Sequence, residues 1–175
     1  MKKFISFCDR LSTIGGIASA VLMIVALSLI TVEMVIRTVF SKTLYITSEY
    51  TGYITAAIAF LALAYTLKEK GHIRVNFLHA ILTDRQKIIL EMYAFSVGFI
   101  LGIMLTVTTV NFFWDALISG TRAMTISETY LAIPRSLLPV GLSILTLQFA
   151  AEFCRSIIML KTGQVGEVES RALGR

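Results

Sequence analysis

Four stretches without a charged residue divide the chain and constrain its fold more than any other feature. They cover residues 11–32, 50–67, 92–114 and 136–151. A helix needs roughly 20 apolar residues to cross the hydrocarbon core of a bilayer, and three of these stretches are that long or nearly so. The fourth reaches that length if its helix begins at Pro134 and continues past Glu152. The pattern therefore predicts an all-α integral membrane protein, with one domain over residues 1–160 and transmembrane helices at about 13–37, 48–68, 84–114 and 134–160.

Composition excludes several other classes of protein. Charged residues make up 15% of the chain and hydrophobic residues 56%, whereas a soluble domain carries about a quarter charged residues. The four helices also leave too little chain for a separate soluble domain. We therefore expect neither a soluble enzyme nor a disulfide-stapled secreted module, and we expect no nucleic-acid partner despite the sequence pI of about 9.4.

The positions of the basic residues predict the orientation in the membrane. Twelve of the 16 Lys and Arg residues lie in the N-terminal segment, in the connection between the second and third helices, or in the C-terminal part. Cytoplasmic loops carry the excess of Lys and Arg, so we expect both termini in the cytoplasm. The C-terminal residues 161–175 are polar and contain glycine, and we expect them to form a mobile cytoplasmic tail.

Two short segments have the pattern of amphipathic helices that lie in the plane of the membrane surface. In residues 1–11, Phe4, Phe7, Cys8 and Leu11 recur at helical spacing, while Lys2 and Lys3 lie elsewhere on the wheel. The other segment lies between the second and third membrane helices, with one apolar face formed by Phe77, Leu78, Ile81 and Leu82. We expect an interfacial helix at each of these places.

The centres of the four predicted helices contain no charged residue, no histidine and no proline. A substrate or proton pathway usually keeps an ionisable side chain or a broken helix near the bilayer midplane. The acids lie at helix ends instead. Glu33 and Arg37, four residues apart, can neutralise each other near the outer surface, and Glu49 complements the dipole in the first turn of the second helix. We infer that the chain has no substrate pathway, no catalytic residue and no metal site of its own.

Gly98 and Gly102 form the clearest helix-packing motif, because small residues let helix backbones approach closely in lipid. Two interpretations stay open from the sequence. The motif can pack one helix of this chain on another, or it can receive a helix of a partner protein.

Two segments of the chain carry recognisable motifs. One is the sequence Thr47-Ser48-Glu49-Tyr50, followed by an apolar helix and the sequence Lys70-Gly71-His72-Ile73-Arg74-Val75-Asn76-Phe77-Leu78. The other is Ile133-Pro134 followed by Leu138-Pro139-Val140-Gly141. Both resemble the small membrane subunit of tripartite ATP-independent periplasmic (TRAP) transporters, the DctQ-like family. The chain departs from the family pattern at two positions. Members of the family usually have a Trp before the second helix, where this chain has Tyr45 or Ile46, and an Asp after that helix, where this chain has Asn76. The resemblance covers roughly residues 10–160.

The resemblance implies a non-catalytic scaffold in a bacterial or archaeal inner membrane. Its partners would be a large DctM-like membrane subunit, a transient DctP-like periplasmic binding protein and membrane lipids. Substrate and sodium would be carried by the large subunit, so this chain would hold no cofactor, and the substrate would be an organic anion such as a carboxylate or sulfonate. Gly71 would let the chain turn sharply, and His72 would hydrogen-bond either across that turn or to the partner, within a motif that also includes Ile73, Val75 and Asn76. Lipid phosphates would be held by Lys68, Lys70 and Arg74.

Two other functions remain as alternatives. A self-sufficient homodimeric multidrug or cation exporter would need a membrane carboxylate, for which Glu33 and Glu91 are the candidates, both at helix ends. A haem-binding anchor subunit of a redox complex would need axial ligands, for which His72 and His79 are the only histidines.

Overall fold

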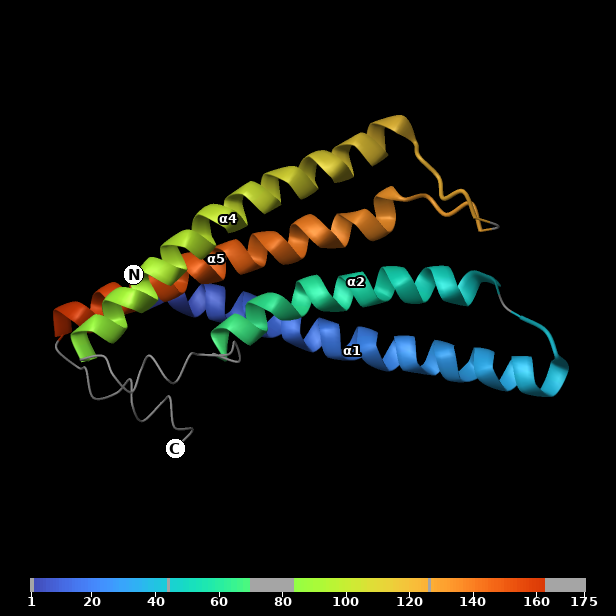
Figure 1. Cartoon of the computed structure of the whole chain (residues 1–175), viewed down its shortest axis with the longest axis horizontal. Coiled ribbons are helices and arrows are strands. Elements are labelled where there is room, and N and C mark those ends of the chain that lie inside the picture. The colour runs from blue at the N-terminus through green and yellow to red at the C-terminus, as the bar shows by residue number, and fades with distance from the viewer. Residues whose placement is uncertain (1, 44, 70–83, 126, 163–175) are drawn as a thin grey trace.

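The computed structural model describes residues 2–43, 45–69, 84–125 and 127–162. Over these residues the chain forms four long α-helices, which are α1 (Lys2–Phe40), α2 (Tyr45–Lys68), α4 (Asp84–Ser119) and α5 (Ala132–Thr162). Each contains a segment long and apolar enough to cross a membrane. The four-helix membrane architecture is therefore confirmed, and Figure 1 shows its arrangement.

The helices alternate in direction, so the bundle has two distinct ends (Figure 1). The start of α1, the end of α2, the start of α4 and the end of α5 lie together at what we call the terminus end. The short connections α1–α2 and α4–α5 lie together at the loop end. Helix α5 contacts each of the other three helices, whereas α4 packs mainly on α5.

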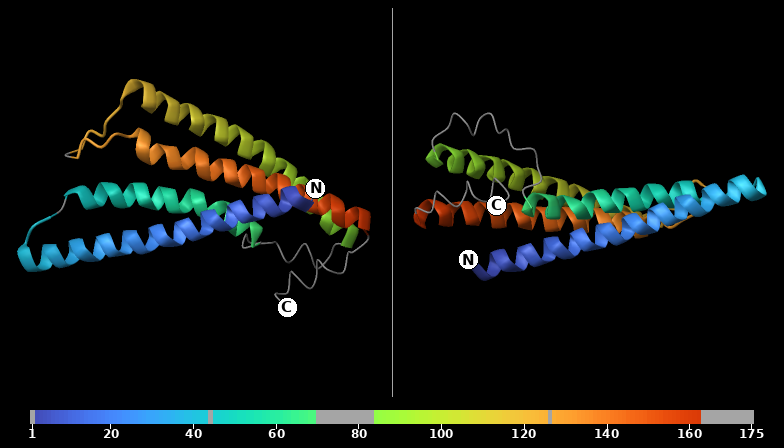
Figure 2. Two further views of the ribbon diagram at one scale, coloured as in Figure 1. Left: turned by 180° about the vertical axis from the view of Figure 1, so that it is seen from behind. Right: turned by 90° about the horizontal axis from the view of Figure 1, so that it is seen from below.

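The predicted separate helix in residues 1–11 is wrong as a distinct element, because α1 runs without a break from Lys2 to Phe40. Packing explains the difference. Ile5 and Cys8 are buried against Ala151 of α5, so the first turns continue the helix along a neighbouring helix. Figure 2 shows this part of α1 beside the last part of α5.

The other helix ends also differ from the predicted bounds. Helix α2 begins three residues before the predicted start at 48, α4 continues five residues past 114, and α5 begins at Ala132 rather than at Pro134. Pro134 thus lies in the first turn, where its missing N–H costs no helical hydrogen bond. Pro139 lies inside α5 and does not delay its start.

Small side chains let α2 and α5 approach closely. A buried cluster joins Ala64 and Leu67 of α2 to Leu142 and Leu145 of α5. Most large apolar side chains on the outer faces of α1 and α4 are exposed, as expected for helices that contact lipid or another membrane protein. The predicted interfacial helix between α2 and α4 and the tail 163–175 lie outside the described residues.

Candidate functional site

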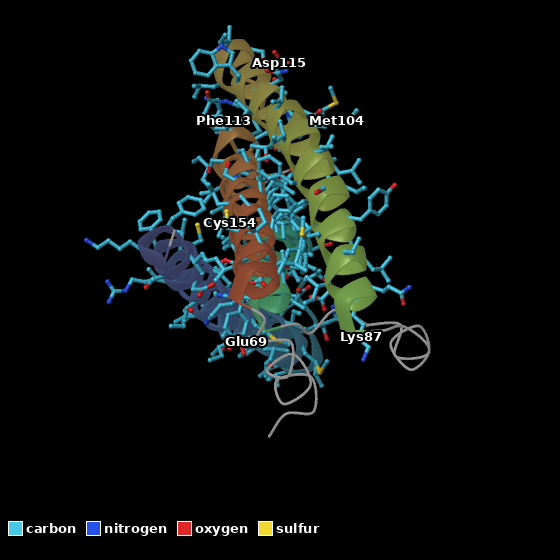
Figure 3. All side chains as sticks on the ribbon, turned by 90° about the vertical axis from the view of Figure 1, so that its left-hand side faces the viewer. Glu69, Lys87, Met104, Phe113, Asp115 and Cys154 are labelled. Atoms are coloured by element: carbon cyan, nitrogen blue, oxygen red, sulfur yellow. The ribbon has the colours of Figure 1, made fainter. Side chains whose placement is uncertain are left out.

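Gly98 and Gly102 of α4 face α5 within this chain. A Cβ atom built on Gly98 would lie 2.5 Å from the ring of Phe149, and one on Gly102 would lie 2.7 Å from Oγ1 of Thr146. The hydroxyls of Thr106 and Thr146 lie 3.2 Å apart on the same interface. The motif therefore packs α4 on α5, which is the first of its two interpretations. Figure 3 shows Met104 on the other side of α4, directed away from α5.

Other glycines bring α1 and α5 equally close to α2. A Cβ on Gly15 would lie 3.0 Å from the backbone oxygen of Leu61, and one on Gly141 would lie 2.6 Å from the backbone oxygen of Phe60. Gly52 differs, because a Cβ there would meet nothing within 4 Å.

At the loop end, Glu49 accepts hydrogen bonds from three hydroxyl groups. The Tyr53 hydroxyl donates to Oε1 at 2.7 Å, and the hydroxyls of Thr125 and Ser127 each donate to Oε2 at 2.5 Å. The expectation that Glu49 lies in the first turn is wrong, because α2 begins at Tyr45 and Glu49 is its fifth residue. The carboxylate instead ties the α4–α5 connection to α2, and we call Glu49, Tyr53, Thr125 and Ser127 the hydroxyl cluster.

The α4–α5 connection is itself folded back as a narrow loop. Ala123 N–H donates to the Thr129 carbonyl at 2.9 Å, and Leu131 N–H donates to the Thr121 carbonyl at 3.1 Å. The Tyr130 hydroxyl donates to the carbonyl of Leu117 in α4 at 3.0 Å. The hydroxyl cluster therefore anchors an ordered loop to the start of α2.

Glu33 and Arg37 form the predicted pair near the loop end of α1. The guanidinium and carboxylate lie 3.1 Å apart, with the Arg37 side chain 63% exposed and that of Glu33 16% exposed. An i, i+4 pair this exposed contributes about 0.3–0.5 kcal/mol. It neutralises charge locally and links no second helix.

At the terminus end, a polar network joins α1 to α5. Ser12 donates to the side-chain oxygen of Gln148 at 2.7 Å, and the Gln148 amide donates to Asp9 at 3.1 Å and to Glu152 at 3.3 Å. Arg155 bridges the two acids, at 2.8 Å from Asp9 and 2.5 Å from Glu152. Ser12, Gln148 and Glu152 are buried. We call these five residues the polar network.

The sequence places Glu152 and Arg155 three residues apart, so these two charges can pair on one helix face. A further signal was present, because Gln148, Glu152 and Arg155 recur at spacings of four and three and so share one face of a helix. Asp9 and Ser12 likewise share a face of α1. What the spacing does not reveal is that these two faces meet.

Lys68 also points toward α1. Its ammonium group donates to the hydroxyl of Thr13 at 2.9 Å and lies 3.2 Å from the carboxylate of Glu69. A role for Lys68 at lipid headgroups remains a prediction. The other residues of the predicted inner-turn site lie outside the described residues, namely Lys70, Gly71, His72, Ile73, Arg74, Val75 and Asn76.

The hydroxyl cluster and the polar network have the chemistry of structural ties. Each joins segments that are distant in the sequence, through hydrogen bonds among its own members. Among the described residues, no group of three or more His, Cys, Asp or Glu side chains gathers in a way that could hold a metal ion. His79 lies outside the described residues and so does His72, so the haem alternative rests on residues that the structure leaves undescribed.

Comparison with known protein families gives a match. The family model described as tripartite ATP-independent periplasmic transporters, DctQ component, matches residues 14–158. The matched range includes all of α2 and α4, most of α1 and all but the last turn of α5. Neither the curated proteins nor the solved structures contain a match to this chain.

Proposed function

The chain belongs to the DctQ family, the small membrane subunit of TRAP transporters, and we propose that it acts as the non-catalytic scaffold on which the large transport subunit is held. In this proposal the large subunit carries out sodium-coupled uptake of an organic anion, a carboxylate or a sulfonate. A periplasmic binding protein delivers the anion. This chain binds neither the anion nor sodium.

The placement of the polar side chains carries the proposal. The hydroxyl cluster and the polar network lie toward opposite ends of the bundle, and each joins elements of the chain to one another. Between them the helices meet through small residues, such as Gly102 against Thr146 and Gly141 against Phe60. Tight interfaces of this kind suit a rigid support better than a moving carrier.

The orientation follows from the distribution of Lys and Arg. We propose that the terminus end faces the cytoplasm and the loop end faces the periplasm, in a bacterial or archaeal inner membrane. The loop anchored by Glu49 would then stand on the side from which the binding protein approaches. Fusions of a periplasm-active phosphatase to the C-terminus and to the 119–131 loop test this, since only the loop fusion should be active.

Reconstitution tests the scaffold function. The purified chain in sealed vesicles should move no organic anion under a sodium gradient, whereas vesicles that also contain the large subunit and the binding protein should accumulate it. Omission of this chain from the complete system should abolish or strongly reduce uptake. Transport by this chain alone would overturn the proposal, as would full uptake without it.

Co-purification tests the partnership separately. The chain should be recovered with the large membrane subunit when both are expressed together. The variants His72→Ala and Gly71→Ala test the motif that the family resemblance singles out. Unchanged assembly and uptake in both variants would remove those two residues from the proposed partner contact.

A further inference from the structure

An apolar cavity of about 220 Å³ lies among α1, α2 and α5 near the loop end. Its walls are mainly aliphatic, and they belong to three of the four segments able to cross a membrane. The lining residues from these helices are Leu22, Tyr50, Tyr53, Ile54, Ala57, Ile133, Pro134 and Leu137. Thr129, from the α4–α5 connection, completes the lining.

Water is a poor occupant for this space. An engineered cavity of about 150 Å³ with aliphatic and aromatic walls stays dry and takes up small apolar molecules instead. This cavity is larger and similarly apolar, and it is partly open to its surroundings. In a bilayer the apolar molecules available at its mouth are lipid acyl chains.

The polar groups of the cavity are confined to the end that faces the loop. Thr129 donates to the Tyr50 hydroxyl at 3.4 Å, and the Tyr53 hydroxyl donates to Oε1 of Glu49. A carboxylate oxygen can accept two hydrogen bonds, and Glu49 has no ion pair among the described residues. The cavity therefore has an apolar body and a polar end, which lies beside the carboxylate of Glu49 through Tyr53.

These features match an amphiphile whose headgroup carries an ammonium group. We propose that the cavity holds one acyl chain of a phospholipid from the leaflet at the loop end, and that the lipid's primary ammonium group lies at Glu49. The lipid would fill a space that the helices of this chain leave open. The site lies wholly within this chain, so its test does not depend on the partner subunits.

Photolabelling in vesicles tests the site directly. The probe is a phosphatidylethanolamine with a diazirine in one acyl chain, mixed into phosphatidylcholine vesicles that contain the full-length protein. After irradiation, peptides with Ile54 and Leu137 should carry more adduct than the peptide with Leu101 and Met104, which are exposed on α4. Equal labelling of the two sets would overturn the proposal.

A variant that fills the cavity separates this site from general lipid contact. Ala57 is 1% exposed and lines the cavity, so Ala57→Leu should abolish the excess adduct. Ala59 lies on the exposed side of the same helix, so the matched control Ala59→Leu should leave the excess adduct unchanged. Leu137→Phe narrows the cavity from α5 and gives the same test if Ala57→Leu does not fold. Adducts that persist in a folded cavity-filling variant would overturn the proposal.

A second probe tests the headgroup. Phosphatidylglycerol with the same photoreactive chain should label the cavity less than the ethanolamine lipid does, because it is anionic. Glu49→Gln should remove this difference while the acyl chain still enters. Equal labelling by both lipids in the unmodified protein would overturn the role of Glu49.

Discussion

The hydroxyl of Ser12 donates a 2.7 Å hydrogen bond to the side-chain oxygen of Gln148, across 136 positions of sequence. Both residues are fully buried. The bond lies where the first turns of α1 meet α5, and the Gln148 amide continues the network to Asp9 and Glu152. Because the contact joins the first helix of the bundle to the last, it closes the bundle.

Loss of this hydrogen bond should destabilise the folded chain by a small, measurable amount. We expect Ser12→Ala to lower the free energy of unfolding by about 0.6 kcal/mol and at most about 1.7 kcal/mol, the range measured for hydrogen bonds between membrane helices. Unfolding in mixed micelles gives the value, and a double-mutant cycle with Gln148→Leu gives the coupling. Ser28→Ala is the control, because that exposed hydroxyl donates to the Ile24 carbonyl of its own helix. Equal effects of the two Ser variants would contradict the prediction.

Arg155 bridges two carboxylates that would otherwise repel each other. Arg155→Met should therefore cost about 1.5–3 kcal/mol, as for other hydrogen bonds to charged groups. Glu152→Gln in the same chain should restore part of the loss by removing one charge. The melting temperature in detergent measures both effects. Arg37→Met, which breaks the exposed pair on α1, should lower the melting temperature less. A double variant no more stable than Arg155→Met alone would exclude charge repulsion as the cause.

The membrane fold could be predicted from the sequence because each membrane-spanning segment must be apolar and helical by itself, whatever its neighbours are. Every backbone polar group in the bilayer must be paired within its own helix, so a long uncharged run is close to a sufficient signal. The helix ends could not be predicted equally well. At the chain start, an apolar face with Lys2 and Lys3 elsewhere on the wheel suggested a separate surface segment, whereas Ile5 and Cys8 pack on Ala151 and continue α1.

The contacts of the candidate site divide in the same way. Glu33 and Arg37 could be paired from the sequence because an i, i+4 spacing places them on one face of any helix. The bond from Ser12 to Gln148 depends on which helices are neighbours and on how each is rotated about its axis. Neither property can be predicted from the spacing of residues within one helix. Glu49 was predicted to act on its own helix, but its partners Thr125 and Ser127 come from a loop that folds back from α4.

Gly102 should tolerate no larger side chain, because a Cβ there would lie 2.7 Å from Oγ1 of Thr146. We expect Gly102→Leu to separate α4 from α5 and to lower the yield of folded protein after extraction, since α4 packs mainly on α5. Gly52→Leu is the matched control, with nothing within 4 Å of its Cβ. That variant should keep or slightly raise stability, because glycine inside a helix costs about 0.5–1 kcal/mol relative to alanine. Size-exclusion chromatography measures the yield of folded protein for both variants. An equal loss of folded protein in the two variants would contradict the packing of Gly102 on α5.

Glu49 should control how firmly the loop at residues 119–131 is held. In Glu49→Ala the hydroxyls of Thr125 and Ser127 lose their shared acceptor, so the loop should open more often while the helices remain folded. The amide hydrogens of Ala123 and Leu131, which bond across the loop, should then exchange with deuterium faster than in the unmodified chain. Hydrogen exchange read by mass spectrometry measures this. Glu128→Ala is the control, because it breaks only the exposed pair with Arg122 at 3.7 Å and should change the exchange much less. If Glu49→Ala leaves loop exchange unchanged, the internal hydrogen bonds of the loop suffice to order it, and Glu49 does not anchor it.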